Sequence, residues 1–272
     1  MPEGDTIFRL AERLRRALAG ETIVEAKSAV AEIREGHLRG TTVVDVSSRG
    51  KNLLIGLSNG LTLHTHLRMH GAWHVYHRGE KWRMPSFRLR LALATATTEA
   101  VCFGAPVVRL IRTERLEADP HLGRLGPDLL ADDFDLAEAL RRLLESPERP
   151  IADALLDQRA VAGIGNVLKS EILFLAKVDP RLEVGALEPA RLRSVLELAR
   201  EVMLRTVIRG RAGFVLPGRV TRVTSRSTLG RGGELWVYER RGEKCLVCAT
   251  PIEMIRQADA RSTYHCPACQ RG

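Results

Sequence analysis

Four cysteines near the C-terminal end constrain the fold of this chain more than any other feature. They form two CxxC pairs, Cys245–Cys248 and Cys266–Cys269, which residues 249–265 separate. A four-thiolate zinc site needs two tight knuckles that a short hairpin brings together, and this spacing fits that arrangement. Two disulfides are disfavoured in the reducing compartment that the rest of the sequence indicates, and a redox-active CxxC would not need a second pair. We therefore predict a C-terminal hairpin that holds one structural zinc ion.

Length and charge narrow the class of protein. With 272 residues, the chain can form two modest domains or one large domain with an appendage. Its 42 Lys and Arg residues against 33 Asp and Glu give a formal net charge of +9. This charge suits a polyanionic partner, although an arginine-rich proteome would also produce it. No apolar run is long enough to span a bilayer, and Glu3 and Asp5 stand where a signal peptide would be basic, so we expect a cytoplasmic protein without a membrane partner.

Hydrophobic periodicity divides the chain into a β-rich part and a helical part. An opening helix is predicted from an N-cap at Asp5 or Thr6 to a stop at Gly20, and its apolar face comprises Ile7, Leu10, Leu14 and Leu18. Short β-type runs follow at 41–47, 51–57, 61–67, 87–93 and 99–103, a spacing typical of a sandwich or barrel. Helices are predicted at 133–145, 151–159, 166–177 and 190–209, and a loop rich in Gly, Arg, Ser and Thr at 210–234.

The segment AGIGNV at 162–167 joins two predicted helices through a glycine turn. Gly163 and Gly165 permit a close backbone approach, and the helix that follows would offer unpaired N–H groups to a phosphate. A plain helix–turn–helix corner fits the same pattern equally well. A dinucleotide-binding GxGxxG motif does not fit, because no strand precedes the glycines and Leu168 takes the third glycine position.

Other residues have both an ordinary and a functional interpretation. Arg261 lies near the expected tip of the zinc hairpin and Lys51 lies in a turn between two strands, where each is either a solvated side chain or a contact to a groove. Five histidines between His64 and His77 lack the carboxylate or cysteine that would complete a metal site, so polar packing or nucleic-acid contact is expected there. Cys102 lies in an apolar run and is assigned to the core.

The start of the chain offers a nucleophile, because the small Pro2 permits removal of the initiator methionine. The terminal amine of Pro2 would titrate at about pH 8, which leaves a useful fraction neutral at physiological pH. Glu3 stands directly beside it, before the opening helix. Many proteins begin with Met-Pro for no chemical reason, so this pair gains meaning only from the rest of the chain.

Six ordered motifs together resemble the Fpg/Nei family of bifunctional DNA glycosylases over nearly the whole chain. They are PEGDT at 2–6, SRGKNLL at 48–54, HLRMHGAW at 66–73, LGRLGPDLL at 122–130, AGIGNVLKSEIL at 162–173, and the cysteine-bearing ELWVYERRGEKCLVC with RSTYHCPACQ. The resemblance implies an α+β multidomain fold, with an N-terminal β-sandwich and its leading helix at 1–115, a helix-two-turn-helix DNA-binding domain at 116–232 and a zinc finger at 233–272. It also implies a monomer, located at the nucleoid, that binds double-stranded DNA containing oxidised bases or abasic sites.

For the mechanism, the resemblance implies that the damaged nucleotide is flipped out of the duplex and that the amine of Pro2 attacks its C1′. A Schiff base then forms, and β,δ-elimination cuts the strand. Glu3 would act as a general acid, and Lys51 and Arg261 would support the reaction as cations or proton donors at the flanking phosphates. Glu171 matches a carboxylate to which we assign a structural role.

The same resemblance assigns DNA contacts and a branch of the family. Arg124 and Asn166 match contacts to the DNA backbone, and the void left by the flipped base would be filled from one loop, by Arg68, Met69 and His70. Gly4 favours the Nei (endonuclease VIII) branch, which prefers oxidised pyrimidines. In agreement with this branch, the segment CFGAP at 102–106 lacks the Arg-Phe pair of the Fpg-branch loop. The 210–234 loop, which contacts the lesion in the Fpg branch, does not indicate specificity in this sequence.

Three alternatives remain open at this point. An Fpg-type glycosylase for oxidised purines would share the scaffold, as would a non-catalytic protein that binds damaged DNA. A zinc-ribbon interaction protein is a third possibility, but it leaves Pro2, Glu3 and the glycine turn unconnected. Thr6 stands where many relatives carry a glutamate, so a secondary catalytic carboxylate is missing.

Overall fold

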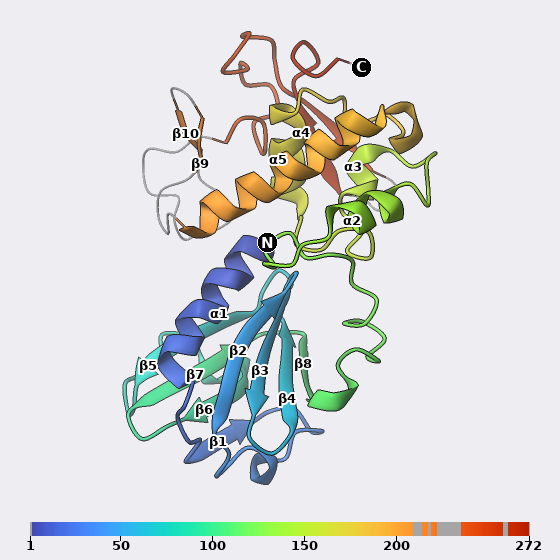
Figure 1. Ribbon diagram of the computed structural model, residues 1–272. Coiled ribbons are helices and arrows are strands. Elements are labelled where there is room, and N and C mark those ends of the chain that lie inside the picture. The colour runs from blue at the N-terminus through green and yellow to red at the C-terminus, as the bar shows by residue number, and fades with distance from the viewer. Residues whose placement is uncertain (1, 209–213, 217–218, 222–234, 258–260, 272) are drawn as a thin grey trace. The chain divides into compact units, whose positions relative to one another are not determined.

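The computed structural model describes residues 2–208, 214–216, 219–221, 235–257 and 261–271 and consists of two compact units (Figure 1). The first, here called the sandwich unit, contains Pro2 and Ile7–Arg124. The second, the helical unit, contains Glu3–Thr6 and Leu125–Gly272. The domain limits expected at 115/116 and 232/233 stay predictions. Most of the loop expected at 210–234 lies outside the described residues, as does Met1.

Two four-stranded antiparallel sheets form the sandwich unit, as predicted (Figure 1). One has the order β1 (Glu25–Ser28), β6 (Leu89–Ala94), β7 (Thr98–Phe103) and β5 (Ala72–His77). The other has the order β2 (Val43–Arg49), β3 (Asn52–Leu57), β4 (Leu61–His66) and β8 (Val107–Arg112). The runs named from the sequence as examples did not include β1, β5 and β8.

The opening helix closes the core of the sandwich unit. Helix α1 (Gly4–Leu18) buries the predicted face, whose members Ile7, Leu10, Leu14 and Leu18 are each at most 7% exposed, in one cluster with the strands. The helix ends as expected, with Gly20 in the left-handed region at φ 82°. The predicted N-cap at Asp5 or Thr6 is wrong, because both residues lie inside the first turn and the helix begins at Gly4.

Short and long helices make up most of the helical unit. The bounds are α2 (Leu136–Leu143), α3 (Ile151–Ala154), α4 (Asn166–Leu175) and α5 (Pro189–Ile208). Helix α3 is shorter than the predicted 151–159, because the Asp157 carboxylate accepts the N–H of Arg159 (2.9 Å) and turns the chain. Two strand pairs follow, β9 (Phe214–Leu216) with β10 (Arg219–Thr221), and β11 (Glu253–Arg256) with β12 (Ser262–His265). Short 3₁₀ turns occur elsewhere, at Glu35–His37, Ser86–Arg88, Thr113–Arg115 and Val184–Ala186.

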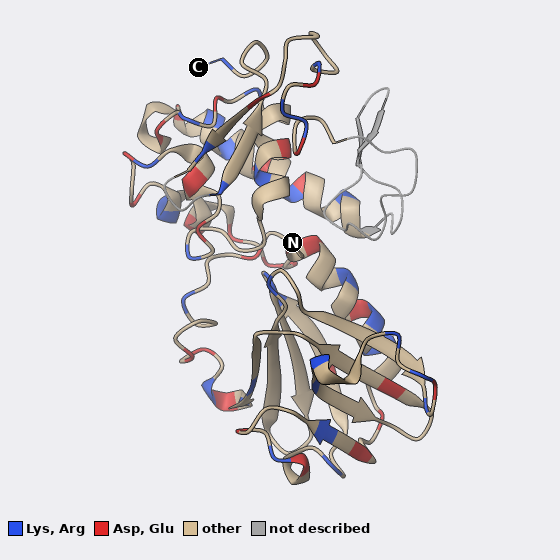
Figure 2. Ribbon diagram, turned by 180° about the vertical axis from the view of Figure 1, so that it is seen from behind, with Lys and Arg blue, Asp and Glu red and all other residues tan. Residues whose placement is uncertain are grey.

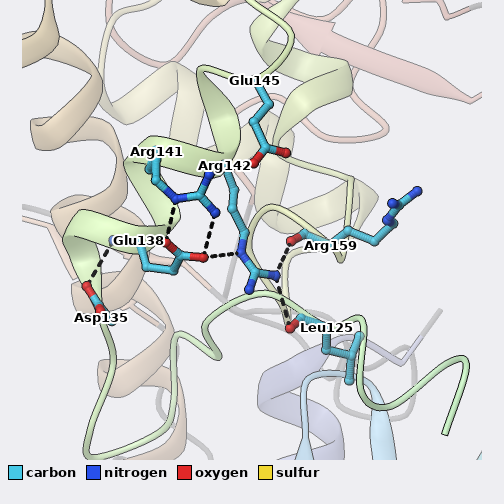
Figure 3. Close-up of polar contacts among 7 residues, drawn as sticks. All are labelled: Leu125, Asp135, Glu138, Arg141, Arg142, Glu145 and Arg159. Atoms are coloured by element: carbon cyan, nitrogen blue, oxygen red, sulfur yellow. Dashed lines mark hydrogen bonds and ion pairs between the residues drawn. The ribbon is translucent and has the colours of Figure 1, made fainter. Parts of the chain in front are cut away.

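Helix α2 fixes the loop that leads into the glycine turn (Figure 3). Asp135 caps the helix by accepting the N–H of Glu138 (2.9 Å), and the Glu138 carboxylate in turn accepts from Arg142 (2.6 Å). Held in this way, the Arg142 guanidinium donates to the backbone carbonyls of Leu125 (3.3 Å) and Arg159 (2.9 Å). One guanidinium group therefore ties the chain at Arg159, just before the glycine turn, to the chain at Leu125.

Figure 2 shows Lys and Arg residues spread over elements of both units, among Asp and Glu. Among the helices of the described residues, none combines the length and the apolar character that crossing a bilayer requires. Cys102 is fully buried on β7, and burial raises the pKa of its thiol to about 12, so its assignment to the core is confirmed.

Candidate active site and zinc centre

The most distinctive contact of the helical unit joins Glu3 to residues more than 160 positions away in the sequence. Its carboxylate is fully buried and accepts three backbone N–H groups, from Gly165 (3.1 Å), Val167 (2.8 Å) and Leu168 (3.0 Å). These donors belong to the first turn of α4, which has no cap from its own N-cap residue. The Glu3 side chain therefore caps α4 from the start of the chain, in place of a side chain at the N-cap residue Gly165. The positive end of the helix dipole favours its negative charge.

Three glycines make this approach possible. A Cβ on Gly165 would lie 2.2 Å from Cδ of Glu3, and a Cβ on Gly4 would lie 2.8 Å from Cα of Gly163. Gly163 also adopts φ 111°, which side-chain-bearing residues rarely adopt, and its carbonyl accepts the N–H of Gly4 (2.9 Å). The glycine turn thus receives the start of α1. The N–H groups of Gly165, Val167 and Leu168, expected to be available to a phosphate, are occupied by Glu3.

Asn166, the first residue of α4, is held by a buried lysine. Lys169 is 0% exposed, and its Nζ donates to Oδ1 of Asn166 (2.7 Å) and Oε1 of Gln257 (2.6 Å). Gln257 lies just after β11, and its N–H donates to the carbonyl of Arg261 (2.8 Å), which precedes β12. One ammonium group therefore ties Asn166 to the β11–β12 turn that bears the exposed Arg261.

Glu171 joins α4 to the chain segment that leads into the cysteines. Its carboxylate, 4% exposed, accepts the N–H groups of Trp236 (2.8 Å), Val237 (3.0 Å) and Tyr238 (3.0 Å). The Trp236 ring also stacks on Phe174, with ring centroids 5.5 Å apart. These contacts confirm the structural role assigned to this carboxylate.

The four cysteines at 245, 248, 266 and 269 meet as the spacing predicts. Their Sγ atoms all lie within 4.8 Å of one another, and three pairs are 3.4–3.9 Å apart. Zn–S bonds of about 2.3 Å in a tetrahedron separate the sulfurs by about 3.8 Å. In the first knuckle, the N–H of Ala249, a residue with φ 62°, donates to the Cys245 carbonyl (2.9 Å). The N–H of Val247 donates to the Cys245 sulfur (3.4 Å). The donor set and its size fit one structural zinc ion.

In the sandwich unit, Lys51 occupies a two-residue hairpin turn between β2 and β3. Arg49 pairs with Asn52, and Gly50 takes φ 58° at the first turn position, as a type II′ turn requires. Lys51 is only 8% exposed. Burial, together with the positive charges of Lys51 and Arg68, lowers the pKa of His66 on the neighbouring strand to about 4.

The loop after β4 is exposed and held by its backbone. Arg68 has φ 46°, and its N–H donates to Nδ1 of His66 (3.2 Å). The N–H of Gly71 closes the turn on the Leu67 carbonyl (2.9 Å). Arg68, Met69 and His70 are all exposed, and Met69 is 58% exposed although it is apolar. This is the loop that the sequence suggested for filling a void in a duplex.

Comparison with known proteins decides the family. Residues 1–105 match the formamidopyrimidine-DNA glycosylase N-terminal domain, 125–216 match its H2TH domain, and 242–272 match the zinc finger found in FPG and IleRS. The chain is 41% identical to a probable endonuclease 8 2 of Streptomyces coelicolor, with 100% of this chain and 95% of that protein covered. The chain belongs to the Fpg/Nei family.

Other members of the Fpg/Nei family extend the likeness. The DNA-(apurinic or apyrimidinic site) lyase Nei2 of Mycolicibacterium smegmatis is 37% identical, with 99% of both chains covered. A solved complex between the Lactococcus lactis Fpg and an abasic site containing DNA superposes with a TM-score of 0.82 at 25% identity and covers both chains completely. The predicted fold class is confirmed, and the four cysteines form the FPG-type zinc finger of this family.

The predicted site residues fall into two groups, one in each unit. Glu3, Asn166 and Arg261 lie in the helical unit with the zinc ligands, where Lys169 and Gln257 connect two of them. Pro2, Lys51, the 68–70 loop and Arg124 lie in the sandwich unit. Pro2 is half-buried, and Arg124, the last residue of the sandwich unit, is exposed.

Sequence reasoning missed the residues that hold these groups in place. Lys169 and Gln257 were not considered, since a lysine and a glutamine normally indicate solvated surface. Asn52 was also missed as the partner of His64, whose Nε2 lies 2.8 Å from its Oδ1; this buried contact agrees with the polar packing expected of the histidines.

Proposed function

We propose that this protein is a bifunctional DNA glycosylase and AP lyase of base excision repair that acts through the N-terminal amine of Pro2. The observation that carries the proposal is the burial of Glu3, whose carboxylate is fixed by three N–H groups directly beside that amine. A rigidly held acid next to a secondary amine is suited to Schiff-base chemistry at a sugar carbon. The S. coelicolor and M. smegmatis relatives, by their names an endonuclease and an apurinic-site lyase, support this assignment.

The proposed reaction balances with the groups at hand. The neutral amine of Pro2 attacks C1′ of a flipped nucleotide, the N–C1′ bond forms, and the base leaves with the electron pair of its glycosidic bond. The C1′–O4′ bond then breaks, and the proton released from the Pro2 nitrogen passes through Glu3 to O4′, which leaves an iminium ion. The iminium acidifies the C2′ proton, which is lost to water as the electron pair of the C2′–H bond expels the 3′ phosphate; loss of a C4′ proton to water then expels the 5′ phosphate (β,δ-elimination).

The remaining site residues would bind DNA around this centre. Lys51 and Arg261 are cations assigned to the phosphates that flank the lesion, and Arg124 and Asn166 are assigned to the DNA backbone. Arg68, Met69 and His70 would fill the space of the flipped nucleotide, for which an exposed apolar Met69 is suited. The zinc ion is held by the four cysteines and supplies folding stability to the β11–β12 hairpin rather than chemistry at the sugar.

Oxidised pyrimidines are the proposed substrates. The names of the relatives, endonuclease 8 and Nei2, and the absence of an Arg-Phe pair in the sequence at 102–106 support the Nei branch. Such a substrate implies action on chromosomal DNA, and we propose a monomer located in the cytoplasm. The Fpg-type preference for oxidised purines is the alternative that the substrate test must separate.

Borohydride trapping tests the central step. Incubation with abasic-site DNA and borohydride should yield one covalent protein–DNA adduct, and peptide mapping should place it on Pro2. The matched control is the same protein with one additional residue retained before Pro2, which converts the amine into a peptide nitrogen and should abolish the adduct. Equal trapping by the extended protein would remove Pro2 as the nucleophile.

A substrate panel tests the preference. Duplexes with one oxidised pyrimidine, one 8-oxoguanine or one abasic site should be compared in single-turnover reactions at equal enzyme excess. Faster excision of the oxidised pyrimidine is expected. Strong preference for 8-oxoguanine would replace the Nei assignment by the Fpg-type alternative, and binding without any excision would leave the non-catalytic one.

A further inference from the structure

A line of polar side chains, buried at His64 and Asn52 and partly exposed at Arg109, crosses the β2-β3-β4-β8 sheet and ends at the Lys51 turn. It runs from Asp119 through Arg109 on β8 and His64 on β4 to Asn52 on β3, all within the sandwich unit. His64 pairs directly with Arg109 across the two strands, and Asn52 is its diagonal neighbour on the other side. His64 is 2% and Asn52 7% exposed, so their hydrogen bonds are not shared with solvent.

Arg109 fixes which groups along this line donate and which accept. Arg109 can only donate, and its Nη2 lies 3.1 Å from Oδ1 of Asp119 and 3.0 Å from Nδ1 of His64. Nδ1 of His64 must therefore accept, so the ring is neutral and carries its proton on Nε2. That proton is donated to Oδ1 of Asn52 at 2.8 Å. The Asn52 amide nitrogen is then directed to the carbonyl of Arg49, at 3.0 Å.

Charges around His64 maintain this arrangement. Burial and the positive charge of Arg109 lower the pKa of His64 to about 4, with smaller effects from His66 and His121 and an opposing effect from Asp119. Asp119 is itself held in place, because its Oδ1 also accepts the N–H groups of His121 (3.0 Å) and Leu122 (3.1 Å). The neutral, Nε2-protonated ring is therefore the form present at physiological pH.

The last bond of the line closes the turn that presents Lys51. Arg49 and Asn52 are the paired residues on either side of Gly50-Lys51, so a side-chain bond from Asn52 to the Arg49 carbonyl spans the turn. The Arg49 guanidinium is held in addition by both carboxylate oxygens of Glu117, at 2.7 and 3.1 Å. The backbone that carries Lys51 is thus braced by residues of β4, β8 and the 117–119 segment.

We infer that Asn52, His64, Arg109 and Asp119 form a relay that positions Lys51 for contact with a phosphate of the bound DNA. The inference rests on the proposed function of Lys51 and extends it to residues that do not touch the substrate. Asn52 is the residue through which the relay acts, since its amide connects His64 to the Arg49 carbonyl at the turn. A displacement of the ammonium by about 1 Å would be enough to reduce the reaction rate on the order of a hundredfold.

Two variants of Asn52 and one matched control test the relay. Asn52→Ala removes both bonds, whereas Asn52→Asp keeps the size and the bond from His64 but cannot donate to the Arg49 carbonyl. Asn59→Ala is the control, because Nδ2 of Asn59 donates to the carbonyl of His37 (2.9 Å) in the turn at the other end of β3. Single-turnover cleavage of abasic-site DNA should be on the order of ten- to a hundredfold slower for both Asn52 variants and unchanged for Asn59→Ala.

A double-mutant cycle with Lys51→Ala separates positioning from general stability. If Asn52 acts through Lys51, the Lys51→Ala/Asn52→Ala protein is no slower than Lys51→Ala alone. The dependence of DNA affinity on salt should also fall by about one phosphate contact in each single variant and no further in the double variant. Additive losses of rate, or an unchanged salt dependence in Asn52→Ala, would overturn the inference.

NMR of the protein without DNA tests the relay independently of the proposed function. Nitrogen NMR should show His64 neutral with its proton on Nε2 between pH 5 and 8, and the amide signals of Gly50 and Lys51 should broaden in Asn52→Ala but not in Asn59→Ala. A protonated Nδ1 on His64, or an unaltered turn in Asn52→Ala, contradicts the relay. A wild-type protein that forms no borohydride adduct contradicts the proposed function instead, and the NMR result still decides the relay.

Discussion

Substitution of Glu3 by Gln tests the contact on which the candidate site depends. The change keeps the shape of the side chain and removes its charge. Hydrogen bonds to a charged group contribute about 1.5–3 kcal/mol each, and those between neutral groups about 1 kcal/mol. The amide oxygen of Gln can accept two of the three N–H groups of Gly165, Val167 and Leu168, while its NH₂ group would face the third as a second donor. After allowance for the lower cost of burying a neutral group, we expect the free energy of unfolding of the helical unit to fall by about 3 kcal/mol.

Catalysis should suffer independently of stability. A positioned acid contributes on the order of 10²–10⁴ in rate, so single-turnover cleavage of abasic-site DNA should slow by at least about a hundredfold at a temperature where the variant is folded. Urea unfolding monitored by Trp236 fluorescence measures the first effect, and quenched-flow or gel-based kinetics measures the second. Glu12→Gln is the matched control, because Glu12 lies on α1, nine positions after Glu3 in the sequence, with a half-exposed carboxylate paired to Arg15.

The two measurements together can refute the reasoning. A Glu3→Gln protein that unfolds within about 0.5 kcal/mol of the wild type, the range of ordinary surface substitutions, would show that the three N–H groups do not depend on the carboxylate. A cleavage rate within threefold of the wild type would show that Glu3 transfers no proton in the slow step. An equal loss in Glu12→Gln would mean that any charge removed from α1 has the same effect.

Two further predictions concern pH and the metal. The folded-state pKa of His64, about 4, is below its ordinary value of 6.5, so the unfolded chain binds more protons between these values and the stability of the sandwich unit rises with pH across that window. From pH 7 to pH 5 the loss attributable to His64 is about 2 kcal/mol; urea midpoints should show it, and a His64→Gln protein whose midpoint changes equally would contradict it. Chelation, or Cys266→Ser, should release about one zinc ion per chain and abolish DNA binding while Trp73 in the sandwich core reports unchanged unfolding; intact binding would show that the hairpin does not contribute to DNA recognition.

Much of the fold could be predicted because its signals are local. The CxxC pairs carry their own spacing, α1 has a regular apolar face, and the glycine turn is flanked by helical patterns on both sides. The errors in the predicted elements also have local causes in the sequence. Helix α3 ends early because Asp157 turns the chain, and β8 was not named because Arg109 interrupts its apolar residues with a partly exposed side chain that pairs with Asp119.

The contacts that organise the site were not predictable in the same way, because they join residues that are distant in sequence. Nothing near Lys169 indicates that Asn166 and Gln257 will provide acceptors for a fully buried ammonium group. Nothing near Glu171 indicates that it will bind three N–H groups at 236–238. Periodicity reports which face of an element is buried, whereas such contacts depend on which elements meet.

The start of the chain and the glycine turn at 162–167 depend on each other. For this reason neither the PEGDT motif nor the AGIGNV motif is informative alone. Glu3 needs the open first turn of α4, and that turn needs an external cap, since Gly165 offers no side chain of its own. A larger residue at Gly165 would collide with Glu3, and a larger residue at Gly4 would collide with Gly163. The start of the chain and the glycine turn therefore constrain each other sterically and electrostatically. Glu3, the residue that follows the proposed nucleophile in the sequence, is thus held by the same helix whose first residue, Asn166, is proposed to contact the DNA backbone.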